Sequence, residues 1–263
     1  MSNFIDFIEP LSKIIKNKIN IENRVTIENT PKIQSSVILG CGKPNLEFIT
    51  KILLNTPTEK IILVDHNIDE NLIENELDRQ LCKLKYRDDI NNLKEMITVD
   101  ELLDIIHYYN KDIMKFFEEY PIQDITYINA FRVFEHIHYR NIPDLLYLIS
   151  TCIDINNFTG LDIIVPDFLK VIYSIHDRFG DGRLSTDKTL LEGELINLNT
   201  EIFNTPEDRH QSVWTEEIMR YYVRLENYWE IKLRTEISMN GRNWYDRYLL
   251  MPGKALLDIQ SKC

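Results

Sequence analysis

Two short apolar runs, the first ending in glycines and the second in an acid, most constrain what this chain can fold into. Residues 37–39 stop at Gly40-Cys41-Gly42, and residues 61–64 stop at Asp65. Apolar residues between them recur every three or four positions, which predicts a helix; they are Leu46, Ile49, Ile52 and Leu53. A strand, glycine turn, helix, strand and acid in this order are typical of a site for a nucleoside-bearing cofactor. Glycines let the backbone approach the ligand, and the carboxylate accepts hydrogen bonds from both ribose hydroxyls.

Later segments extend the same alternation of strands and helices. Strands are predicted at 96–99, at 125–128 just before Asn129, and at 161–165, with helices at 102–117 and 142–153 and a helix starting at Thr215. Residues 229–237 alternate at period two, and Asn240-Gly241 is a strong hairpin signal before a partner strand at 244–250. We therefore expect an α/β fold, doubly wound, with a mostly parallel seven-stranded sheet closed by an antiparallel C-terminal hairpin.

The length of 263 residues fits one such domain with elaborations. We expect a helical N-terminal extension at 1–34 and a cofactor-binding domain at 35–263. Within that domain, 168–215 is an insertion interrupted by glycines. Placed after the fifth strand, the insertion is predicted either to cover the carboxyl ends of strands four and five or to be a surface excursion.

Charge and cysteine content narrow the class of partner and compartment. With 30 Lys and Arg against 42 Asp and Glu, the net charge is −12, which does not favour direct binding to nucleic acid. The four cysteines form no Cys-x-x-Cys pair, so a zinc cluster is not expected. Their wide spacing fits a reduced compartment, so we expect the protein to be cytoplasmic. The sequence shows no apolar run of membrane-spanning length, and Asp6 and Glu9 interrupt any N-terminal signal-like segment.

Four motifs together resemble those of the class I S-adenosylmethionine (SAM) dependent methyltransferases. Val-Ile-Leu-Gly-Cys-Gly at 37–42 is similar to their first motif and Ile-Leu-Val-Asp-His-Asn at 62–67 to their second. Phe134-Glu135-His136-Ile137 and Val165-Pro166-Asp167-Phe168 resemble the "EH" and "VPD" motifs of a loosely characterised methyltransferase group. The third glycine that the family often carries near Pro44-Asn45 is absent here. The resemblance implies SAM as cofactor and methyl transfer to an acceptor that the sequence leaves open.

The resemblance also implies a set of cofactor-binding residues. They are Gly40, Cys41, Gly42, Asp65, His66, Asp100, Asn129, Ala130 and Phe131. Asp100 follows the predicted third strand, where methyltransferases often hold the adenine amino group. The alternative is a first-turn acid of a capping box formed by Thr98 and Glu101, and Asp88 and Asp89 are rivals for the adenine. Cys41 is expected to be a small packing residue between the glycines.

Three residues are candidates for the catalytic base, namely Glu135, His136 and His210. An unperturbed histidine titrates near neutrality, which suits general-base catalysis. His210 lies in a loop ahead of the Thr215 helix, where the related methyltransferase group often has a histidine. His136 and His138 would share a face only on a strand, and this segment follows a strand, so no metal site is expected.

Other functions remain open beside methyl transfer. A catalytically silent SAM-fold subunit fits the absent acceptor signature. A nicotinamide-dependent oxidoreductase is opposed by the missing third glycine and by the Asn240-Gly241 hairpin. An enzyme that transfers the aminopropyl-type arm of SAM is a narrower alternative. Assembly with a second copy or with a partner protein is left open.

Overall fold

The computed structural model describes residues 34–42, 49, 52, 58–66, 75, 79, 103–120, 124–173, 210–226, 228–239 and 242–260. The predicted N-terminal extension, the predicted strand at 96–99, Asp88, Asp89, Asp100 and positions 174–209 of the insertion lie outside these residues. The chain divides into two compact units, Met1–Tyr127 and Ile128–Cys263, and each is described by itself.

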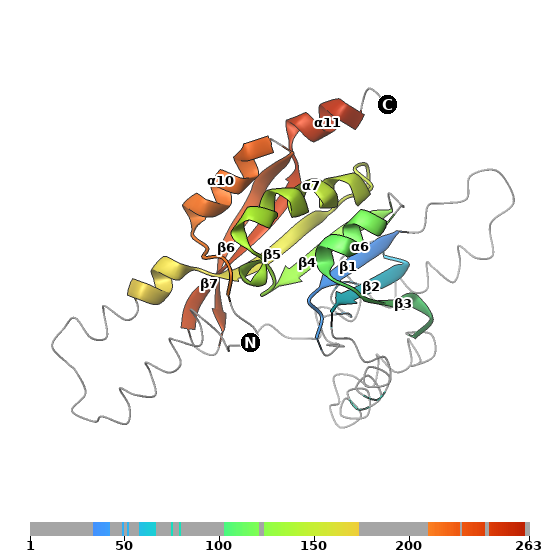
Figure 1. Cartoon of the computed structure of the whole chain (residues 1–263), viewed down its shortest axis with the longest axis horizontal. Coiled ribbons are helices and arrows are strands. Elements are labelled where there is room, and N and C mark those ends of the chain that lie inside the picture. Colours follow the sequence, from blue (N-terminus) through green and yellow to red (C-terminus); the bar gives the residue numbers. More distant parts are fainter. Residues whose placement is uncertain are drawn as a thin grey trace, which may run out of the picture. The chain divides into compact units, whose positions relative to one another are not determined.

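Seven strands form one mixed sheet in the order β3-β2-β1-β4-β5-β7-β6 (Figure 1). They are β1 (Ser35–Leu39), β2 (Lys60–Asp65), β3 (Ile106–Asn110), β4 (Ile125–Phe131), β5 (Gly160–Pro166), β6 (Trp229–Met239) and β7 (Arg242–Pro252). β2 pairs in parallel with β1 and with β3, whereas β7 pairs antiparallel with β5 and with β6. The predicted fold class and its C-terminal hairpin are confirmed.

The first unit is organised around β1 and β2, which are almost wholly buried. Continuous apolar runs are expected of parallel strands that are covered on both faces. Ile38, Ile61 and Leu63 form a buried cluster with the helical residues Ile49 and Ile52. This packing holds the end of β1 close to the end of β2, where the predicted glycine turn and acid lie.

The prediction of a helix over 102–117 is wrong for its central part. Residues Ile106–Asn110 form β3, paired with β2 from Ile61↔Ile106 to Asp65↔Asn110. The run Ile-His-Tyr-Tyr is rich in β-branched and aromatic residues, which pack well on a sheet. Helix α6 (Ile113–Glu119) begins only after Asp112, whose Oδ1 accepts hydrogen bonds from the backbone N–H groups of Met114 and Lys115. Asp100 and the strand predicted before it lie outside the described residues, so the proposed adenine contact of Asp100 stays a prediction.

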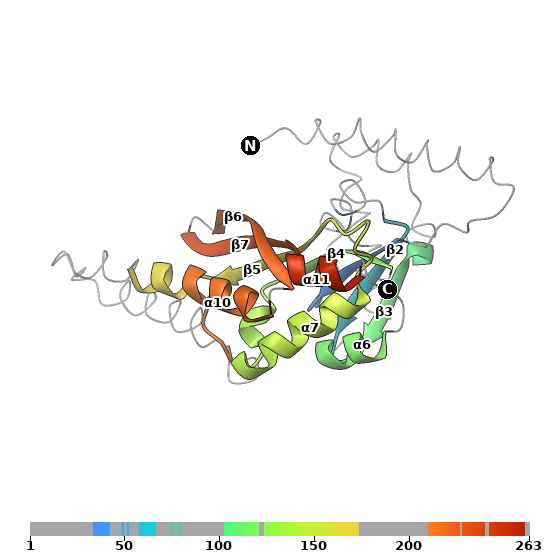
Figure 2. The same ribbon diagram turned by 90° about the horizontal axis from the view of Figure 1, so that it is seen from above.

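The described helices of the second unit include α7 (Ile142–Cys152), α10 (Glu216–Glu226) and α11 (Lys254–Gln260). In Figure 2, α7 and α10 lie on the same side of β5, β6 and β7. The indole Nε1 of Trp229 donates a hydrogen bond to the carbonyl of Leu146 at 3.0 Å, which ties β6 to α7. The predicted helices at 142–153 and after Thr215 are confirmed. None of the helices that the structure describes is both long and apolar enough to cross a membrane.

We expect Gly160→Ala to destabilise the protein by about 2–4 kcal/mol. Gly160 begins β5 with a φ of +147°, which L residues rarely adopt, and an added Cβ would overlap Leu249 Cδ1, the end of a side chain that would have to shift. Urea unfolding measures the change. Comparing the double variant Gly160→Ala with Leu249→Ala against Leu249→Ala alone isolates the backbone strain, because the overlap is absent from both. A change below about 1 kcal/mol for Gly160→Ala would contradict this prediction.

Candidate functional site

The turn after β1 contains two glycines with positive φ angles. Gly40 and Gly42 have φ values of 57° and 48°, in the left-handed region that glycine adopts at little cost. The N–H of Gly42 donates a hydrogen bond to Asp65 Oδ2 at 2.9 Å, and the N–H of Gly40 donates to the carbonyl of Val64 at 2.8 Å. Among the residues that the structure describes, no atom lies within 4 Å of a Cβ built on Gly42. The glycine turn and the acid therefore form one connected feature at the ends of β1 and β2.

Cys41 lies next to the two glycines and His66 next to Asp65, and their side chains differ in exposure. Burial, with a smaller contribution from the Asp65 charge, raises the pKa of the Cys41 thiol to about 12. The thiol is therefore protonated at neutral pH, which suits a packing residue and not a nucleophile. His66 is 75% exposed at its side chain, and its Nδ1 lies 3.3 Å from Asp65 Oδ1.

In the second unit, β4 continues through Asn129 and Ala130 to Phe131, so Asn129 lies inside the strand and not at its end. Asn129 is 1% exposed, and no described residue hydrogen-bonds to its Oδ1. Ala130 is fully buried and Phe131 is exposed. Because an unsatisfied buried oxygen costs about 1–3 kcal/mol, Asn129 is a position where a ligand donor would be favourable.

The three candidate bases come together in this unit. Glu135 and His136 lie on the 3₁₀ helix Phe134–His136, and Glu135 is completely buried. The rings of His136 and His210 meet edge to face with centroids 4.8 Å apart. One ligand atom from each of Glu135, His136 and His210 lies within 4.8 Å of the others. Arg132 places its Nε 3.7 Å from Glu135 Oε1.

His138, the other histidine of the motif, has different surroundings. It precedes the short helix Tyr139–Asn141, where its Nδ1 accepts a hydrogen bond from the N–H of Arg140 at 3.3 Å. Its ring packs on Tyr139 with centroids 4.6 Å apart. His138 is therefore not part of the group that Glu135, His136 and His210 form.

A pocket of about 570 Å³ opens beside His210. Its lining combines aromatic, aliphatic and a few polar side chains, and consists of Tyr139, Phe168, His210, Gln211, Ser212, Val213, Ile218, Tyr221 and Tyr222. Tyr222 donates a hydrogen bond to the carbonyl of Tyr139 at 3.2 Å, which links α10 to the segment after β4. Sequence reasoning missed the tyrosines; their adjacency at 221–222 on an amphipathic helix was the available signal.

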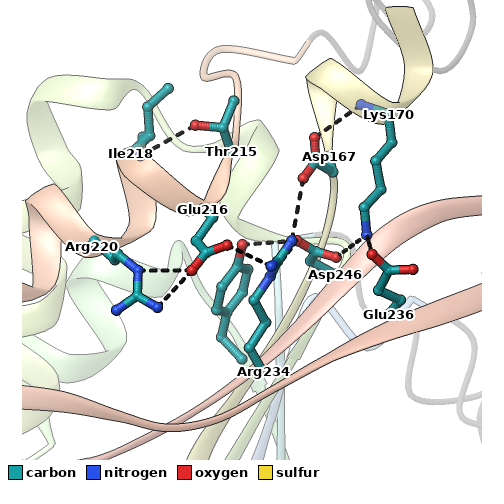
Figure 3. A network of polar contacts seen from close by, with 10 residues as sticks. Asp167, Lys170, Thr215, Glu216, Ile218, Arg220, Arg234, Glu236 and Asp246 are labelled. Atoms are coloured by element: carbon teal, nitrogen blue, oxygen red, sulfur yellow. Dashed lines mark hydrogen bonds and ion pairs between the residues drawn. The ribbon is translucent and has the colours of Figure 1, made fainter. Parts of the chain in front are cut away.

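Sequence reasoning also missed a charged network whose side chains come from β6, β7, α10 and the residues just after β5 (Figure 3). Asp246, with a side chain only 1% exposed, accepts hydrogen bonds from Lys170 Nζ, Arg234 and the Tyr248 hydroxyl. Arg234 also bonds Glu216 of α10, and Lys170 also pairs with Glu236. Asp167, the acid of the "VPD" motif, accepts a hydrogen bond from the N–H of Lys170 at 3.1 Å and so starts the helical turn at 168–173. This acid has a structural role in the second unit.

The strand order, with three parallel strands at one end and an antiparallel pair at the other, is the one expected of the class I SAM-dependent methyltransferase fold. Among solved structures, the riboflavin-related dimethyltransferase RosA from Streptomyces davawensis matches with a TM-score of 0.50 and 11% identity. The alignment covers 92% of this chain and 54% of that one. A SAM-dependent methyltransferase from Anabaena variabilis matches at a TM-score of 0.44 and 12% identity, with 96% of each chain covered. No family model and no curated protein sequence matches the chain. The likeness therefore concerns the fold.

Proposed function

We propose that this protein binds SAM and transfers its methyl group to an acceptor. The observation that carries the proposal is the connected turn and acid in the first unit. Gly40 and Gly42 adopt left-handed backbone conformations after β1, and the N–H of Gly42 donates a hydrogen bond to the carboxylate of Asp65 at the end of β2. A ligand with a ribose and a charged amino-acid tail suits such a feature, because the exposed backbone binds polar groups and the carboxylate binds ribose hydroxyls.

The protein's own part in the reaction would be orientation and proton transfer. The SAM sulfonium already activates the methyl group, so the chain has to bring the acceptor in line with it. His136 and His210 supply two imidazole side chains in ring contact, and Glu135 supplies a buried carboxylate beside them. The aromatic pocket next to His210 suits an acceptor with an apolar or planar portion.

We expect Asp65→Ala to weaken SAM binding about tenfold or more while the protein stays folded. A charge-assisted hydrogen bond contributes roughly 1.5–3 kcal/mol. Isothermal calorimetry with SAM measures the affinity. Asp104→Ala, at an exposed acid of the same unit, is the matched control and should bind as the parent does. Equal SAM affinity in Asp65→Ala would remove this residue from the cofactor site.

A turnover assay separates methyl transfer from its alternatives. Incubation of the protein with SAM and cell extract should yield S-adenosylhomocysteine. Tight SAM binding without this product would favour a catalytically silent SAM-binding subunit. Methylthioadenosine in its place would indicate transfer of the aminopropyl-type arm. A nicotinamide-dependent enzyme is opposed by the antiparallel β6–β7 end of the sheet, which a dinucleotide-binding dehydrogenase does not require.

A further inference from the structure

We propose that Glu135, His136 and His210 form a binding site for a divalent transition-metal ion such as Zn²⁺. Two imidazole nitrogens and one carboxylate oxygen make up a ligand set that such ions bind well, and three protein ligands leave further positions for water or substrate. Magnesium and calcium are less suited, because they prefer oxygen ligands. The assignment rests on these side chains and does not depend on methyl transfer; with an ion bound, the three residues would act by holding the ion and not as free bases.

The backbone brings the three residues together across a long stretch of sequence. The N–H groups of Gln211 and Ser212 both donate to the carbonyl of Glu135, at 2.7 and 3.1 Å. The hydroxyl of Ser212 donates to the carbonyl of Phe134 at 2.9 Å, and Trp214 Nε1 donates to that hydroxyl. These bonds hold the segment that carries His210 against the 3₁₀ helix that carries Glu135. The convergence is therefore built by hydrogen bonds outside the ligand atoms, as in sites whose geometry is set before the ion binds.

The spacing of the ligand atoms is close to that of a metal site. Bonds of about 2.0–2.2 Å place the ligands of one ion roughly 3–4 Å apart. The three atoms here lie within 4.8 Å of one another. The remaining difference is about an ångström, which small rotations of the imidazole and carboxylate groups can supply.

The electrostatics of Glu135 favour a cation at this place. A completely buried carboxylate is stable only when it is paired, hydrogen-bonded or bound to a metal. Arg132 places its Nε 3.7 Å from Glu135 Oε1 and supplies one positive charge beside this carboxylate. Arg132 is also held elsewhere, since its guanidinium lies over the Tyr245 ring at 5.6 Å. A divalent ion would therefore add to the neutralisation of Glu135 that Arg132 provides.

The site lies beside the aromatic pocket, because His210 belongs to both. An ion there would have an open position within reach of a ligand in the pocket. A bound oxygen of that ligand would be polarised and its proton more acidic. The chemical class of ligand implied is one with a hydroxyl or carboxylate next to an apolar portion.

The test uses the full-length, tag-free protein, stripped with a chelator and titrated with Zn²⁺ alone by calorimetry, with no SAM present. Elemental analysis of the dialysed protein gives the stoichiometry. We expect one ion per chain, with affinity reduced at least tenfold in both Glu135→Gln and His210→Gln. Co²⁺ should give a ligand-field spectrum in the parent protein that both variants lack.

His138→Gln is the matched control, because this histidine lies two residues from His136 and takes no part in the group. Its affinity for Zn²⁺ should equal that of the parent. Thermal unfolding guards against a folding defect, because Zn²⁺ should raise the Tm of the parent and of His138→Gln but not of the two ligand variants. Absence of stoichiometric binding in the parent, or equal binding in parent, Glu135→Gln and His210→Gln, would overturn the proposal. SAM binding is measured separately, so this failure would leave the proposed methyl transfer intact.

Discussion

Asp246→Asn is expected to lower the free energy of unfolding by about 3–5 kcal/mol, a fall in Tm of roughly 6–20 °C. The change keeps the shape of the side chain and removes its charge. Lys170 and Arg234 then lose the anion that both of them contact, in a place where that carboxylate is only 1% exposed (Figure 3). Thermal and urea unfolding measure the loss. Glu230→Gln, at an exposed acid of β6, is the control and should stay within about 0.5 kcal/mol of the parent.

The same variant should change how stability depends on pH. Burial opposes ionisation of Asp246, yet the hydrogen bonds from Lys170 and Arg234 hold its pKa below 3.8. A lowered pKa in the folded state contributes stability above the unfolded value of about 3.9, which is lost as the pH falls through the folded value. The gap between parent and Asp246→Asn should therefore shrink below about pH 4. Burial raises the pKa of Asp167. The contribution of Asp167 to folding stability therefore has the opposite pH dependence, because it is lost as the pH rises. A gap that does not change with pH, or one below 1 kcal/mol at pH 7, would count against the role of Asp246.

Gly42→Val is expected to reduce SAM affinity at least a hundredfold. The φ of +48° is strained for a β-branched residue, and the new methyl groups would take up room where the proposed cofactor meets the turn. A displaced turn also breaks the hydrogen bond from Gly42 N–H to Asp65. Calorimetry with SAM and circular dichroism together report affinity and folding.

Gly42→Asn separates strain from volume. Asparagine tolerates the left-handed region better than valine, so this variant should be more stable than Gly42→Val and still bind SAM weakly. A folded Gly42→Val that binds SAM within threefold of the parent would show that the turn does not cradle the cofactor.

Strands and helices with a clear hydrophobic periodicity or a clear end signal were predictable from the sequence. The buried runs of β1 and β2, the period-two hairpin and the helix after Thr215 each carry such a signal. β3 does not, because Ile106–Asn110 lies within apolar spacing that also suits a helix, and only its pairing with β2 decides the outcome. A strand of five residues depends on its neighbour for stability, and that neighbour is far away in sequence.

The sequence named the three residues of the candidate site, but it did not predict that they lie close together. Glu135 and His136 were found from their motif, and His210 from its position before a helix. Their convergence depends on the hydrogen bonds of Gln211 and Ser212 to Glu135, which link residues about 75 positions apart. The Asp246 network was not predictable, because the partners of a strand acid depend on the register of β6 against β7.

The hairpin has a consequence for association with other molecules. β6 ends the order of strands, and its pairing with β7 shifts register between Ile231 and Leu233 and again between Ile237 and Met239. Such bulges bend a strand and increase its twist, and charged residues at 230, 232, 234 and 236 lie along it. A twisted, charged border is a poor template for adding a strand from a second chain. If two copies of this protein associate, they are expected to do so through side-chain packing and not by extending the sheet at β6.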